Sequence, residues 1–134
     1  MFGMYPQGLI IGEFMNSYVL EKRTSEAIFY DIDCTNLLDV IETITSVTSV
    51  LSDQIGLTFL GAAINSDLIT FPDGYSAAIG KVISVQISGG AIPTPQVNQL
   101  YTIRALFVTS EANTREATVL LNVTNVPIQS GRVI

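Results

Sequence analysis

The sequence predicts an all-β protein, built as an antiparallel β-sandwich of about seven strands. Apolar side chains alternate with polar ones over residues 83–87, 101–107 and 117–123, a period of two that is typical of half-buried strands. Turn-forming residues recur about every 8–12 residues, the spacing expected of a sandwich. β-Branched residues dominate residues 42–51, and such residues favour strand over helix.

The clearest element is a hairpin near the C-terminal end. Its two strands, residues 101–108 and 116–123, flank the polar turn "SEANTR", in which we expect Asn113 to be left-handed. One face of the hairpin carries the side chains expected in the core: Tyr101, Ile103, Ala105, Phe107, Ala117, Val119, Leu121 and Val123. Of these, Ile103, Phe107, Val119 and Leu121 should form the centre of its apolar contact.

The remaining strands are expected upstream of this hairpin. In chain order they are residues 26–32, 42–51, 56–60, 67–71 and 82–88. The last of them ends in Gly89 and Gly90, which make a turn that only glycine adopts at low cost. "FPDGY", residues 71–75, is a Pro-Asp-Gly turn. Helix is limited to about one turn, near residues 36–39 or 75–80.

Both ends of the chain depart from this pattern and divide it into three parts. Residues 1–22 are expected to be an N-terminal arm, residues 23–124 the sandwich, and residues 125–134 a C-terminal tail. The arm is apolar where a solvated tail would be polar, so we expect it to bind a neighbouring subunit; the alternative is that it packs over its own sandwich. The expected partner-binding residues are Phe2, Met4, Tyr5, Leu9, Ile10, Ile11, Phe14 and Met15.

Composition limits the class of protein. The 134 residues suit one domain, with 48% apolar and 13% charged residues and a mean hydropathy of +0.44. With so little charge, some apolar surface is expected to meet another chain, as in a homo-oligomer. The net charge is −6 and the six cations are spread along the chain, which argues against nucleic-acid binding. Neither a signal peptide nor a membrane span is expected.

Residue types argue against catalysis and against a cofactor. The chain has no histidine, so the usual general base is missing. Its single cysteine, Cys34, is expected to be an apolar filler and not a reactive thiol. One Cys without His excludes a zinc site, and neither phosphate-binding glycine motif is present. The sequon Asn122-Val123-Thr124 is expected to be coincidental.

One acidic segment has two interpretations, a Ca²⁺ site or a solvated strand end and loop. Asp31 and Asp33, with Asp39 and Glu42 close behind, lie in a stretch free of Lys and Arg from Ala27 to Gln54. A Ca²⁺ site would need several such carboxylates, but the spacing is not that of a calcium loop. We therefore favour a solvated strand end and loop.

The arrangement of these motifs resembles a known family. "EKRTSEAIFYDID", "ETITSVTSV", "GLTF", "KVISVQISGG" and "YTIRALFVTSEANTREATVLLNV" together are similar to small single-domain immunoglobulin-like proteins of tailed-bacteriophage virions. The resemblance covers residues 21 to about 123. It implies an immunoglobulin-like sandwich. The chain departs from many such sandwiches in having no tryptophan, which leaves the core to Phe, Tyr and Ile.

The resemblance also implies a role in a virion, assembled in the host cytoplasm. The expected function is that of a capsid decoration or cement protein, which binds the major capsid protein or other virion subunits in many copies through its arm and sandwich surface. A neck, tail or head-fibre component is the alternative, as is an adhesin that binds host-surface carbohydrate. Among the loops only Tyr75 is an evident sugar-stacking residue, and this favours assembly over sugar binding.

Overall fold

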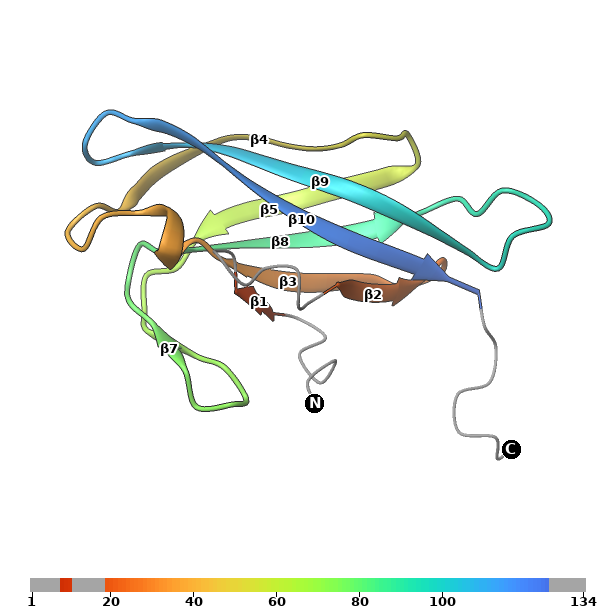
Figure 1. Cartoon of the computed structure of the whole chain (residues 1–134), viewed down its shortest axis with the longest axis horizontal. Helices are drawn as coiled ribbons and strands as arrows, with labels where there is room; N and C mark the ends of the chain where they lie inside the picture. The colour runs from red at the N-terminus through yellow and green to blue at the C-terminus, as the bar shows by residue number, and fades with distance from the viewer. Residues whose placement is uncertain (1–7, 11–18, 126–134) are drawn as a thin grey trace.

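The computed structural model describes residues 8–10 and 19–125, and places two four-stranded β-sheets face to face (Figure 1). One sheet has, in spatial order, β1 (Gly8–Ile10), β3 (Ala27–Asp33), β8 (Val82–Gly89) and β5 (Leu57–Ile64). The other has β2 (Leu20–Arg23), β10 (Thr114–Thr124), β9 (Asn98–Thr109) and β4 (Ile44–Ser52). The predicted all-β class and sandwich arrangement are confirmed.

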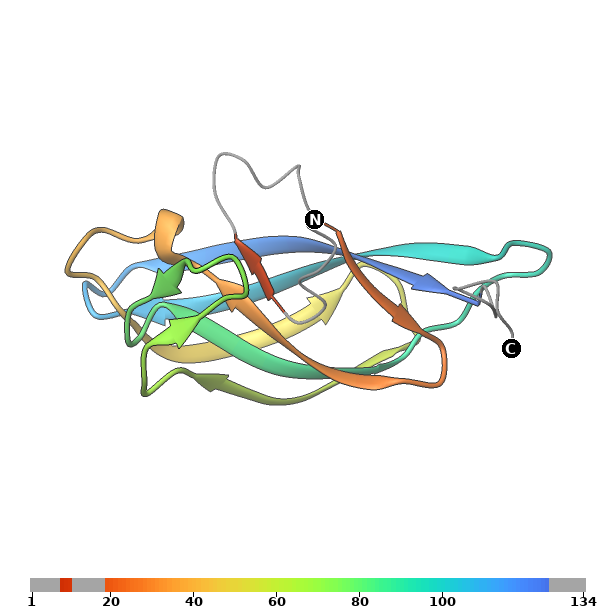
Figure 2. The ribbon, with the colours of Figure 1, turned by 90° about the horizontal axis from the view of Figure 1, so that it is seen from below.

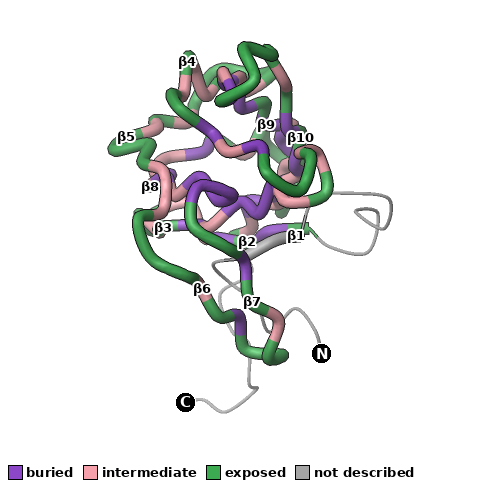
Figure 3. Tube along the Cα trace, turned by 90° about the vertical axis from the view of Figure 1, so that its left-hand side faces the viewer, coloured by how far each residue is buried: buried purple, intermediate pink, exposed green. Residues whose placement is uncertain are grey.

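A small hairpin projects from the sandwich body (Figures 1 and 3). It pairs β6 (Ile69–Thr70) with β7 (Ser76–Ala77) across the predicted Pro-Asp-Gly turn. The strand expected at 67–71 is therefore shorter than predicted, and residues 75–80 include a strand where a helical turn was considered. The described residues contain one 3-10 turn, Thr35–Leu37, close to the other predicted position.

The core lies between the two sheets, as the buried stretches in Figure 3 show. All eight hairpin side chains predicted to be in the core are at most 2% exposed. From the facing sheet, the alternating Ile83, Val85 and Ile87 of β8 are fully buried. The sequence period of two thus identified the buried face of each of these strands correctly.

The glycine turn predicted at residues 89 and 90 is confirmed, whereas the left-handed conformation predicted for Asn113 is wrong. Gly89 and Gly90 have φ of +79° and +112°, and a Cβ on Gly89 would lie 2.5 Å from the Gly56 carbonyl oxygen, so glycine is required there. In the β9–β10 turn, however, the left-handed residue is Ala112, with φ of 62°, and not Asn113. Asn113 instead donates hydrogen bonds to Thr109 and Glu42.

The structure has more strands than the seven predicted, and not all of its strand pairings are antiparallel. Ten strands are present in the described residues, and two pairings, β1 with β3 and β2 with β10, are parallel. β5 also runs on to Ile64, beyond the residues 56–60 expected. The strands of both sheets run along the long axis of the molecule (Figure 2).

The boundary predicted at residue 22 lies too late in the sequence. β2 begins at Leu20, which is 2% exposed, and pairs with β10. Lys22 is also buried, and its ammonium donates hydrogen bonds to the carbonyls of Arg23 and Gly89. Leu20 to Lys22 therefore belong to the sandwich and not to an arm.

Within residues 8–10 and 19–125, no helix has the length and apolar character that a membrane span requires.

Candidate functional site

One end of the sandwich carries a tight turn whose two central side chains project into solvent. The turn is residues Asp39–Glu42, in the β3–β4 connection, and is closed by a 3.0 Å hydrogen bond from the Glu42 N–H to the Asp39 carbonyl. Val40 is 93% exposed and Ile41 is 80% exposed. We refer to residues Asp39–Glu42 as the braced turn, because two buried charged side chains hold it.

The first brace is Lys81, which immediately precedes β8. Its side chain is 6% exposed, and its ammonium donates hydrogen bonds to the carbonyl oxygens of Asp39, at 2.9 Å, Val40, at 3.1 Å, and Glu42. The Lys81 N–H also donates to the Asn65 side chain at 3.0 Å. These bonds attach the backbone of the turn to the end of a core strand, and bonds from a charged donor are the stronger kind.

The second brace is the carboxylate of Glu42, which is fully buried. One oxygen accepts from the Asp39 N–H at 3.0 Å, and the other accepts from Thr109, Asn113 and Arg115 of the β9–β10 hairpin. The Arg115 guanidinium adds an ion pair at 3.2 Å. The turn is therefore fixed to both sheets.

These donors stabilise the ionised form of Glu42. The Thr109 hydroxyl contributes most, the Asp39 N–H next, and Asn113 and Arg115 less; together they outweigh burial and lower the pKa of Glu42 to about 2.

The lowered pKa makes stability depend on pH at this residue. Because the folded pKa lies below the unfolded one of about 4.3, the stabilising effect of Glu42 is complete above about pH 4.3. It is lost as pH falls through about 2. The variant Glu42→Gln should thus be less stable than the parent at neutral pH, with a difference that shrinks in acid.

Urea denaturation across this pH range measures the effect. Glu116→Gln, which removes an exposed carboxylate of β10, controls for the loss of one negative charge. A deficit of Glu42→Gln that stays constant down to pH 2 would contradict the assignment.

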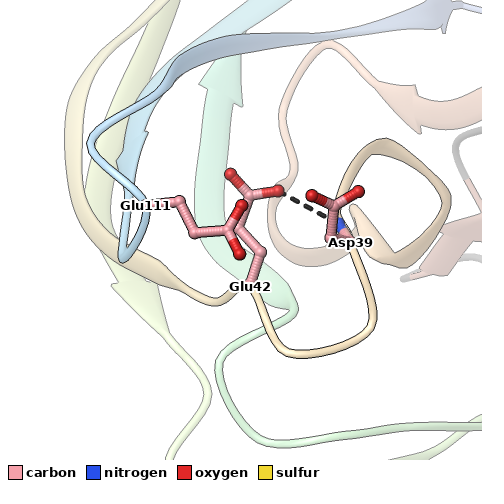
Figure 4. A group of neighbouring side chains, drawn as sticks. All are labelled: Asp39, Glu42 and Glu111. Carbon is pink, nitrogen blue, oxygen red and sulfur yellow. Dashed lines mark hydrogen bonds between the residues drawn. The ribbon is translucent and has the colours of Figure 1, made fainter.

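Two further carboxylates lie near that of Glu42, one within the braced turn and one in the β9–β10 connection. Those of Asp39, Glu42 and Glu111 lie within 4.8 Å of one another (Figure 4). Desolvation and then the nearby Asp39 carboxylate raise the pKa of Glu111. Glu42 already accepts from protein donors through both oxygens, so the cluster offers a cation only Asp39 and Glu111, fewer ligands than Ca²⁺ takes. The cluster forms an acidic rim beside the apolar tip.

The acidic segment expected from the sequence is divided by the fold. Asp39 and Glu42 lie in the braced turn, whereas Asp31 and Asp33 lie on β3, where they accept hydrogen bonds from Ser84 and from Thr35. Asp33 and Glu42 are buried, so the favoured prediction of a solvated segment is wrong for these two residues.

Cys34 and the arm residues complete the predicted sites. Cys34 is fully buried, and burial, with a smaller effect of Asp33, raises the pKa of its thiol, which suits the predicted filler role. Leu9 and Ile10 lie in β1, whose backbone pairs with β3 of the same chain. The other predicted arm residues lie outside the described residues: Phe2, Met4, Tyr5, Ile11, Phe14 and Met15.

Sequence reasoning singled out Asp39 and Glu42 only as part of an acidic segment, and it missed the exposed tip and the side chains that brace it. Val40 and Ile41 are two β-branched residues between two acids, and nothing in that local pattern distinguishes a buried pair from an exposed one. Lys81 is 42 positions from Asp39, and Arg115 is 73 positions from Glu42. Only the folded chain brings these braces to the turn.

The fold and the turn define a β-sandwich that presents a rigid apolar tip with an acidic rim. No protein-family model matches the chain, and no curated protein matches it.

Proposed function

We propose that this chain is a structural protein of a tailed-phage virion, a capsid decoration or cement protein that attaches to the capsid lattice through the braced turn. The placement in a virion rests on the sequence resemblance described above. The observation that carries the mode of attachment is the near-complete exposure of Val40 and Ile41 on a turn whose backbone is fixed.

The energetics favour a partner at this tip. Burying an aliphatic side chain of this size contributes roughly 1.5–3 kcal/mol. A flexible loop would lose much of that gain in ordering, but the braced turn is already ordered by Lys81 and Glu42. Binding energy is usually concentrated in a few residues that are fully desolvated in a partner's pocket, and the projecting tip could supply such residues.

The surface charge defines what the partner should offer. Among the described residues Lys22 and Lys81 are buried, Arg23 is half-buried and Arg115 is paired with Glu42, which leaves Arg104 as the one cation in the exposed class. Eight carboxylates of the described residues are exposed: Glu21, Glu26, Asp39, Asp53, Asp67, Asp73, Glu111 and Glu116. The partner should therefore present an apolar recess flanked by Lys or Arg, and a phosphate backbone would be repelled.

The topology supports an immunoglobulin-like version of the sandwich. The orders β3-β8-β5 and β4-β9-β10 correspond to strands B-E-D and C-F-G of that fold. Tyr101, near the start of β9, donates a 2.7 Å hydrogen bond from its hydroxyl to the Ala91 carbonyl, as does the tyrosine at the E–F corner of such domains.

The same attachment chemistry serves a neck, tail or head-fibre component, and these positions remain alternatives within the proposal. A carbohydrate-binding adhesin has less support. The Tyr75 ring is stacked on Phe71, with centroids 6.0 Å apart, in the β6–β7 hairpin, so one of its faces is already occupied by the protein.

Replacing both tip residues by aspartate tests the proposal. The double variant Val40→Asp, Ile41→Asp should stay folded, because both side chains are exposed, and should bind capsids with an affinity lower by roughly a hundredfold or more. Co-sedimentation with capsids of the phage's own major capsid protein measures the affinity.

The matched control is Ile55→Asp, a 95% exposed residue in the β4–β5 connection at the opposite end of the sandwich. It should bind like the parent. Full occupancy by the tip variant would refute attachment through the braced turn. A chain lacking residues 1–7, which keeps β1 and the buried Leu20, tests the first part of the arm without removing a strand of the sheet.

A further inference from the structure

β5 is an open sheet edge that carries no charge. It ends the sheet β1-β3-β8-β5, and within the described residues no strand pairs with its outer side. Its eight residues, "LTFLGAAI", include neither a charged side chain nor a proline. Open edges are normally protected by charges, proline or bulges, because unpaired N–H and C=O groups otherwise take up another strand.

The other edges of the sandwich are protected. β1 has three residues, and β2 has four, of which Glu21, Lys22 and Arg23 are charged. β4 is uncharged, but its pairing with β9 is interrupted twice between Ile44 and Ser49. β5 pairs regularly with β8 from Leu57 to Leu60 and has a single interruption after that. Of the edges described, β5 is the best able to accept a strand.

Two cross-strand rows on the face beside this edge are also neutral. Phe29 of β3, Gln86 of β8 and Leu60 of β5 form one cross-strand row, and Phe29 and Leu60 are 54% and 56% exposed. The next row is made of Ala27, Ser88 and Thr58. Another chain could therefore approach the edge without meeting a carboxylate in either row.

We propose that β5 pairs with β5 of a second copy, antiparallel and across a twofold axis, to join two sandwiches through one continuous sheet. Elsewhere the exposed carboxylates of two copies would repel, whereas the β5 edge meets its twin without like charges. A twofold contact requires a self-complementary surface. Of the two long uncharged edge strands described, β4 and β5, β5 has the fewer interruptions, so a second β5 is the strand best suited to fill the edge. This inference does not depend on the virion assignment.

Sedimentation velocity of the full chain tests the pairing. The parent should show a concentration-dependent mass approaching twice 14.5 kDa. Leu60→Lys places a cation on the paired edge of each copy and should weaken the dimer roughly tenfold or more. Phe29→Lys, on the same face but two strands away, and Leu51→Lys, an exposed residue of the β4 edge, should dimerise like the parent.

Amide hydrogen exchange locates the contact independently. Exchange in residues 57–64 should slow as concentration rises through the dimer dissociation constant, and Leu60→Lys should abolish that dependence. A chain that stays monomeric at all concentrations overturns the inference. So does a dimer that Phe29→Lys or Leu51→Lys dissociates while Leu60→Lys does not, since another surface would then form the interface.

Discussion

Truncation of Phe107 to alanine should destabilise the protein by about 3–5 kcal/mol, the cost of removing a buried aromatic ring. Phe107 is fully buried and is among the largest side chains in the core. It lies on β9, the strand between β10 and β4, opposite Arg115 on one side and Val47 on the other. Because both neighbouring strands are fixed, the cavity cannot close easily, which places the expected loss toward the upper part of that range.

Urea or guanidinium denaturation measures the loss. Leu106→Ala is the control, because Leu106 lies on the outer face of β9 and is only partly buried; its cost should be clearly smaller. If the Phe107 variant kept the parent's denaturation midpoint while the Leu106 variant lost stability, the assignment of the buried face would be wrong.

Replacing Lys81 by methionine should destabilise the protein by at least about 3 kcal/mol. The substitution keeps most of the volume but removes the ammonium, and three carbonyl oxygens then face an apolar side chain. Each hydrogen bond to a charged donor contributes about 1.5–3 kcal/mol, and buried acceptors left without a donor add a cost. The braced turn should also become mobile, so capsid affinity should fall although Val40 and Ile41 are unchanged.

Arg104→Met is the matched control, since Arg104 is exposed on the outer face of β9; it should change stability by no more than about 0.5 kcal/mol. Denaturation gives the stability, and backbone hydrogen exchange of residues 39–42 gives the mobility of the turn. A Lys81→Met protein as stable as the parent, with unchanged exchange in the turn, would show that Lys81 does not brace it.

The sequence by itself determined the strands of the core and the faces they bury. Over 101–107, 117–123 and 83–87 the alternation of side chains reflects the pleat of a strand, a local property that each segment carries wherever it pairs. The requirement for glycine at position 89 could also be predicted from the local sequence, because few other residues adopt a positive φ.

Only the tertiary structure decided which strands pair and what the charged residues do. The sequence assigned Leu20 to Lys22 to the arm, yet "LEKR" forms β2, which pairs with β10, and the Lys22 ammonium reaches the Gly89 carbonyl 67 positions away. Glu42 and Lys81 look like surface charges in sequence, but the fold buries both and uses them to hold Val40 and Ile41 in solvent. A buried charge depends on donors and acceptors from distant strands, and the amino-acid pattern around it does not specify these partners.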